Sequence, residues 1–75
     1  MKKKTKLGFI GFGEAAYHIS KGLMESDAHI SAFDIKANDP EVGGMIQERA
    51  RSTQVHLVPS LEQLVEVSEI IFCTT

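Results

Sequence analysis

Hydrophobic residues occur in short runs along this chain, and their spacing changes from one run to the next. The run over residues 6–10 shows no clean alternation, which is typical of a strand covered on both faces of a parallel sheet. Over residues 14–26 the apolar positions recur three and four residues apart, which predicts a helix packed on that sheet. Its expected buried face carries Ala15, Ala16, Ile19 and Leu23, with Gly22 beside them.

The middle of the chain repeats this change from strand to helix. Residues 30–34 predict a second strand that an aspartate ends. Asp39 has the chemistry of a helix N-cap, and Pro40 suits the first helical position, so a second helix is expected over residues 40–50. Residues 55–58 then predict a short third strand, closed by a proline.

The last part of the chain predicts one more helix and one more strand. Ser60 and Gln63 have the spacing of a capping box, which opens a short helix. The apolar residues of that helix are Leu61, Leu64 and Val65. Residues 69–75 are rich in β-forming residues and almost continuously apolar, so they predict a fourth strand.

The order of these elements defines a fold class. It reads β-α-β-α-β-α-β, and right-handed crossovers arrange such strands in a parallel sheet of order 3-2-1-4. This α/β arrangement is a partial Rossmann fold, because the complete fold uses about six strands. We therefore expect residues 1–75 to be the N-terminal part of a dinucleotide-binding domain, without the domain that carries substrate and catalysis.

A glycine turn follows the first predicted strand. Gly11, Gly13 and Ala16 fill the G-x-G-x-x-A spacing, in which the first glycine turns tightly, the second admits a pyrophosphate and the third position stays small. Asp34 comes 21 residues after Gly13, close to the interval of about 20 residues at which a carboxylate binds the adenosine ribose. Strand, turn, helix and acid together predict a site for a dinucleotide.

The acid also predicts which dinucleotide is bound. Asp34 suits the free ribose diol of NAD and repels a 2′-phosphate, whereas Lys36 two residues later would offset part of that repulsion. NAD is therefore the expected cofactor, with NADP as the alternative. No cationic side chain is needed for the pyrophosphate, because a helix N-terminus presents unpaired N–H groups and a positive dipole.

Composition narrows the function further. The chain has 75 residues, 43% of them hydrophobic and 24% charged, which is typical of a globular domain. A net charge of −2 gives no support for nucleic-acid binding, and no apolar run approaches the ~20 residues that span a bilayer. The single cysteine, Cys73, excludes an internal disulfide, is typical of the reducing cytoplasm and is expected to be a buried, inert thiol.

The histidines and two of the arginines do not require a role in a functional site. His18, His29 and His56 occur singly, without the spacing of metal ligands, so no metal site is expected. Arg49 and Arg51 lie near the end of the second predicted helix, where a cation is stabilised by the negative pole of the helix dipole, so neither requires a ligand.

The chain resembles the NAD(P)-binding domain of the 6-phosphogluconate and 3-hydroxyisobutyrate dehydrogenases, the β-hydroxyacid dehydrogenase family. The resemblance lies in residues 8–16, in Asp34 with its preceding strand, and in residues 70–75. The sequence of the glycine turn resembles most the 6-phosphogluconate dehydrogenase-like branch of this family. It implies that the cofactor is bound by Gly11, Phe12, Gly13, Glu14, Ala15, Asp34, Ile35, Lys36, Thr74 and Thr75.

The resemblance also limits the expected activity. The catalytic lysine of the family lies further along its sequence, and neither Lys21 nor Lys36 matches it, so this chain alone is expected to be inactive. A free-standing nucleotide-binding or regulatory module is the alternative, and a fragment that folds without binding is a third. The apolar strand at Ile70–Cys73 looks like part of an interrupted domain, and its exposed edge predicts self-association.

Overall fold

The strands form one parallel sheet. The computed structural model describes residues 5–24 and 28–73, and its four strands lie in the order β3-β2-β1-β4. Their bounds are Thr5–Ile10 for β1, Ala28–Phe33 for β2, His56–Leu57 for β3 and Ile70–Cys73 for β4. At the centre, Phe9 of β1 pairs in register with Ala32 of β2 and Phe72 of β4. The α/β class and the order 3-2-1-4 predicted from the sequence are confirmed.

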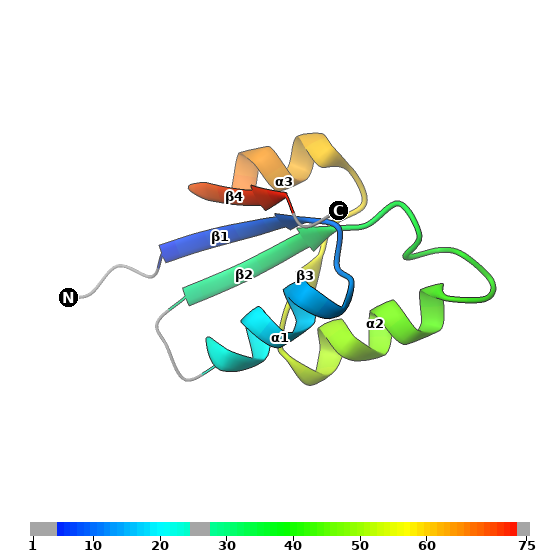
Figure 1. Ribbon diagram of the computed structural model, residues 1–75. Coiled ribbons are helices and arrows are strands. Elements are labelled where there is room, and N and C mark those ends of the chain that lie inside the picture. The colour runs from blue at the N-terminus through cyan, green and yellow to red at the C-terminus, as the bar shows by residue number, and fades with distance from the viewer. Residues whose placement is uncertain (1–4, 25–27, 74–75) are drawn as a thin grey trace.

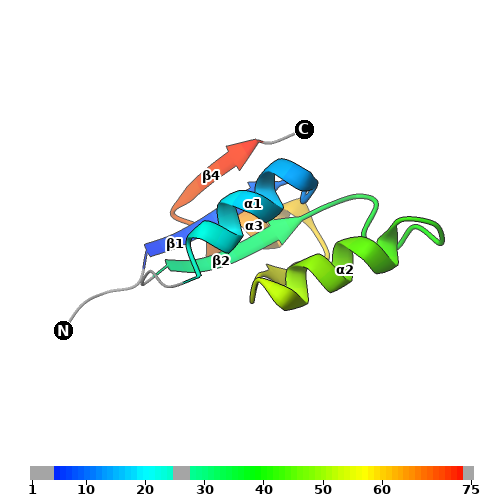
Figure 2. The same cartoon turned by 60° about the horizontal axis from the view of Figure 1, so that its bottom comes forward.

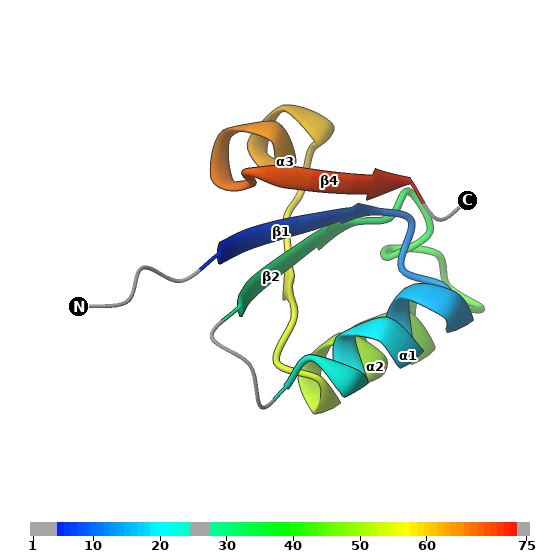
Figure 3. The same cartoon turned by 60° about the vertical axis from the view of Figure 1, so that its left-hand side comes forward.

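Helices cover both faces of this sheet. The helices α1 (Glu14–Gly22) and α2 (Gly43–Ser52) lie on one face, and α3 (Leu61–Val67) lies on the other (Figures 1 and 3). The chain moves from β1 outward to β3 and then crosses back over β1 to reach β4. Because each crossover is right-handed, this reversal of direction moves α3 to the opposite face.

The core lies between the sheet and the pair α1 and α2. Alternate residues of a strand point to opposite faces, so Phe9 and its register partner Ala32 both face this layer, where each is fully buried. The buried cluster consists of Phe9, Phe12, Ala16, Ile30, Ala32, Ile46, Ala50 and Val55. On the other face, α3 contributes Leu64, which is also fully buried.

Helix α1 presents only part of the expected face to the sheet, since Ala16 and Leu23 pack on the core and the other two residues do not. Ala16 and Ser20 are its buried residues, whereas Ala15 is exposed and Ile19 is 47% exposed. The requirement for a small residue at the third motif position explains the difference, because it fixes Ala16 against the sheet. The residue one turn later on that face is then Ser20. The helix also ends at Gly22, four residues before the predicted end.

Helix α2 begins three residues later than predicted. Residues 40–42 form turns, and the helix starts at Gly43 with Val42 at its N-cap. The Asp39 carboxylate nevertheless accepts hydrogen bonds from the N–H groups of Glu41 and Val42, at 2.7 and 3.1 Å, as an N-cap would. These two bonds lower the pKa of the Asp39 carboxyl, because they stabilise its ionised form. Asp39 therefore caps the turn that leads into α2.

The start of α3 follows the sequence closely. Ser60 is its N-cap, and the Ser60 hydroxyl accepts a hydrogen bond of 3.2 Å from the N–H of Gln63. This is one of the two bonds of the predicted capping box. None of the helices in residues 5–24 and 28–73 is long and apolar enough to cross a membrane.

Strand β4 forms one edge of the sheet and is exposed throughout. Its three large apolar residues, Ile70, Ile71 and Phe72, are 37–48% exposed, although the Phe72 ring stacks on that of Phe9 at 5.6 Å between centroids. Cys73 is exposed too, so the expectation of a buried thiol is wrong. The physical reason is that α3 packs against β1 and β2 rather than over the edge strand.

We expect the chain to self-associate through this edge, because an apolar edge strand presents backbone groups that pair with a strand of a second molecule. Sedimentation velocity at high protein concentration should give twice the mass of a single chain. Ile70→Lys, at a residue that is 48% exposed, should restore a single-chain mass. Met24→Lys places the same charge on another exposed apolar residue, beyond α1, and should leave the dimer intact. A wild-type chain that stays monomeric would contradict the expectation.

Candidate functional site

The candidate site lies where the carboxyl ends of the strands meet. Strands β1 and β2 end side by side, and the turn after β1 leads directly into α1 at the same end of the sheet (Figures 1 and 2). Ligands of open parallel sheets bind in the crevice outside the carboxyl ends of the strands, next to the point where the strand order reverses. Here that reversal lies between β1 and β4.

The first glycine of the motif makes the tight turn that was predicted. Gly11 has a φ of 89°, in the left-handed region that only glycine adopts readily. Its N–H donates to the carbonyl oxygen of Phe33 at 2.7 Å, so the turn continues the pairing of β1 with β2 for one more bond. The start of α1 is thereby held against the end of β2.

The second glycine leaves the start of α1 open. Gly13 is the N-cap of the helix and forms no side-chain cap bond, while its carbonyl oxygen accepts the N–H of Tyr17 at 3.0 Å. A Cβ built on Gly13 would meet nothing within 4 Å. The first N–H groups of a helix have no partner within the helix, so this open space suits an anionic group such as a diphosphate.

Asp34 binds the glycine turn directly. One carboxylate oxygen, Oδ2, accepts the N–H of Phe12 at 2.8 Å, and the other, Oδ1, accepts the N–H of Lys36 at 2.8 Å. The acid at the end of β2 therefore joins the turn after β1 to the turn after β2. Each carboxylate oxygen has two lone pairs, so both can still accept a hydrogen bond from a ribose hydroxyl.

A groove of about 500 Å³ runs from the glycine turn to α2. It brings together six of the predicted cofactor-binding residues, namely Gly11, Phe12, Gly13, Asp34, Ile35 and Lys36. Phe12 is fully buried in the core, and its N–H donates to the carboxylate of Asp34. Glu14 and Ala15 are exposed at the start of α1 without lining the groove, and Thr74 and Thr75 lie outside the described residues.

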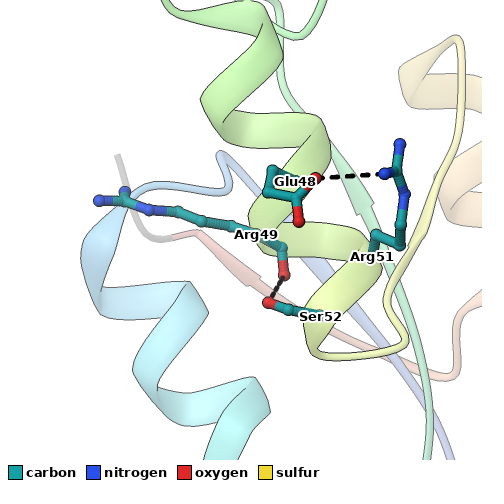
Figure 4. A network of polar contacts seen from close by, with 4 residues as sticks. All are labelled: Glu48, Arg49, Arg51 and Ser52. Carbon is teal, nitrogen blue, oxygen red and sulfur yellow. Dashed lines mark hydrogen bonds and ion pairs between the residues drawn. The ribbon is translucent and has the colours of Figure 1, made fainter.

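Four further residues of the groove come from α2 and the turn before it, and the sequence did not identify them as site residues. They are Val42, Met45, Ile46 and Arg49. Arg49 extends toward α1 (Figure 4). Its guanidinium carbon lies 5.5 Å from the centre of the Tyr17 ring. Explaining Arg49 by the helix dipole alone therefore overlooks its contact with α1. Periodicity of α2 could have found Val42, Ile46 and Arg49, which recur at three- and four-residue spacing on one face.

Among residues 5–24 and 28–73, the other reactive side chains do not form a second cluster. His18 lies 3.7 Å from Glu14 on the exposed side of α1, and Cys73 is exposed on the edge strand. Within the described part of the chain, no three His, Cys, Asp or Glu residues are placed to hold a metal ion.

Comparison with known proteins supports the fold alone. No protein-family model and no curated protein matches the chain. The solved structure of a conserved hypothetical protein from Sinorhizobium meliloti 1021 is similar, with a TM-score of 0.86 and 30% sequence identity. The similarity covers 97% of this chain and 24% of that protein, so the chain spans about a quarter of its length.

Proposed function

We propose that this chain binds NAD and forms the cofactor-binding segment of an oxidoreductase similar to the β-hydroxyacid dehydrogenases. In such an enzyme the nicotinamide, when bound, exchanges a hydride with a hydroxyacid. The residues of this chain bind and orient the adenosine half of the cofactor. The proposal rests on the chemistry of the groove and on the resemblance of the glycine turn.

The start of α1 suits the diphosphate of the cofactor. Gly13 leaves room for a phosphate beside the first N–H groups of the helix, which donate hydrogen bonds and carry the positive end of the dipole. Glu14 is the one acid in this first turn, and its carboxylate lies near His18, one turn further along α1. A diphosphate bound at the start of α1 would contact the N–H groups of the first helical turn.

The observation that carries the proposal is the hydrogen bond from the N–H of Phe12 to the carboxylate of Asp34. This bond holds the acid that we propose for the ribose against the turn that we propose for the diphosphate, although Phe12 and Asp34 are 22 positions apart in the sequence. The ribose carries its phosphate on the 5′-oxygen, only a few bonds from the hydroxyl groups. The protein groups that bind the hydroxyls and the phosphate must therefore be neighbours. In this chain they are in contact.

Substitution of Asp34 tests this proposal. Asp34→Asn is expected to lower the affinity for NAD relative to NADP by roughly tenfold to a hundredfold, because a charge-assisted bond to the ribose contributes roughly 1.5–3 kcal/mol and the 2′-phosphate is no longer repelled. Titration of each cofactor into isotope-labelled protein, followed through the amide signals of Gly11 and Gly13, measures both affinities.

The matched control is Asp39→Asn, because Asp39 likewise has a carboxylate that accepts two backbone N–H groups, and it does not line the groove. It should leave both affinities unchanged. Tighter binding of NADP than of NAD by the wild-type chain would refute the expected preference for NAD. Amide signals that respond to neither cofactor would favour a fragment that folds without binding.

The chemical step is expected to need residues outside this chain, because the resemblance implies that the catalytic lysine of the family lies further along its sequence. The groove holds Lys36 and Arg49 as its cations, and its acid is already bound by two N–H groups. We therefore expect no reduction of NAD by hydroxyacids with this chain alone. A rate above background would show that catalysis does not need a further domain. A free-standing nucleotide-binding module remains the alternative, and it would bind AMP and NAD equally well.

A further inference from the structure

Arg49 and Arg51 lie two residues apart on α2 and have different surroundings. Arg51 pairs with Glu48 of its own helix at 3.2 Å, and both side chains are largely exposed. Arg49 points away from this pair toward α1 (Figure 4), where it lies over the Tyr17 ring and lines the groove. It is also less exposed than Arg51. On one helix, Arg49 is therefore a cation of the groove and Arg51 is a cation of the exposed surface.

The guanidinium of Arg49 has no carboxylate partner among the residues that the structure describes. Its contact with the Tyr17 ring holds the long side chain across the gap between α2 and α1. Cation–π contact leaves the N–H donors at the rim of the guanidinium available. Arginine presents these donors as a rigid fork that matches the oxygens of a phosphate.

The charges lining the groove favour an anion. Asp34 is its single carboxylate, and Lys36 and Arg49 are its two cations. Both oxygens of Asp34 already accept a backbone N–H. A ribose bound at Asp34 would lie in the same groove as two cations, Lys36 after β2 and Arg49 on α2.

Resting on the proposed dinucleotide site, we propose that Arg49 binds a phosphate on the 2′-oxygen of the adenosine ribose, so that the groove accepts NADP as well as NAD. Asp34 binds the diol of NAD, and Arg49 with Lys36 compensates its repulsion of the 2′-phosphate. The selectivity between NAD and NADP then depends on the relative strength of two interactions, that of Asp34 with the diol and that of Arg49 with the 2′-phosphate.

Adenosine 2′,5′-bisphosphate and 5′-AMP test the assignment, because they share the adenosine and the 5′-phosphate and differ only in the 2′-phosphate. Both are titrated into isotope-labelled wild-type protein and into the variants Arg49→Gln and Arg51→Gln. Arg49→Gln should weaken the bisphosphate about tenfold, as expected for the loss of a charge-assisted bond, and should change AMP less than twofold. Arg51→Gln removes the same charge from the same helix and should change neither ligand by more than twofold.

The outcomes separate this inference from the proposed function. Equal weakening of both ligands by Arg49→Gln would overturn it, since Arg49 would then contact the shared 5′-phosphate or act only on the fold. No change in either ligand would overturn it too. Arg49→Lys retains the charge without the fork and should recover part of the lost affinity for the bisphosphate. If AMP fails to shift the amides of the glycine turn in the wild-type chain, the dinucleotide site itself is refuted.

Discussion

A Gly8→Val variant is expected to be less stable than the wild-type chain by about 3 kcal/mol, because it adds a branched side chain where the core is already filled. Gly8 lies in the middle of β1 and faces α3. A Cβ at this position would lie 2.9 Å from Cβ of Ser68 and 3.2 Å from Cδ1 of Leu64, which is fully buried. Since the total stability expected for a chain of this length is roughly 4–11 kcal/mol, the loss is a large fraction of it.

Urea unfolding followed by circular dichroism measures this loss. The matched control is Gly22→Ala, because a Cβ on Gly22 meets nothing within 4 Å at the end of α1. Alanine is the better helix former, so the control should keep or raise stability, by up to about 1 kcal/mol. A Gly8→Val variant with the wild-type unfolding midpoint would mean that α3 does not pack on β1 as described.

Gly13→Val is expected to keep the fold and lose the cofactor. The added side chain would enter the open space at the start of α1, where a Cβ has no neighbour within 4 Å, so it should cost the folded protein about 1 kcal/mol through the weaker N-cap. The same atoms would occupy the position proposed for the diphosphate. Loss of two charge-assisted bonds to N–H groups corresponds to a decrease in NAD affinity of at least about a hundredfold.

Binding and stability have to be measured on the same variant. Gly44→Ala is the control, since Gly44 also has open space around its Cβ and does not line the groove, and it should bind NAD like the wild type. Gly13→Ala should give an intermediate loss of affinity. If Gly13→Val binds NAD with wild-type affinity, the diphosphate does not lie at the start of α1.

Much of the fold could be predicted because it depends on local patterns. The apolar runs locate all four strands, and the Gly11 turn needs a residue that tolerates a φ of 89°. The Ser60 cap is a contact between residues three positions apart. Errors arose where a boundary or a face depends on packing. Asp39 caps a turn before α2 rather than the helix itself, and Ile19 is exposed because Ala16 fixes how α1 rests on the sheet.

The candidate site also has a part that the sequence predicts and a part that depends on packing. The spacing of Gly11, Gly13 and Asp34 follows from the geometry of one β-α-β unit, so sequence distance predicts it. Arg49 and Met45 belong to the next unit, and their place in the groove depends on how α2 packs beside α1. The sequence offers only the helical spacing of α2 as a signal, and that spacing alone does not say which partner the face meets.

The sequence by itself determined the order of elements, the handed arrangement of the strands and the glycine turn, because these depend on neighbouring residues and on the chirality of the chain. Only the tertiary structure decided that Asp34 holds the N–H of Phe12, that Gly8 faces α3, that Cys73 is exposed and that Arg49 lines the groove. Each of these contacts or exposures depends on segments that are distant in the sequence. Their positions follow from how whole helices and strands pack, which no local pattern specifies.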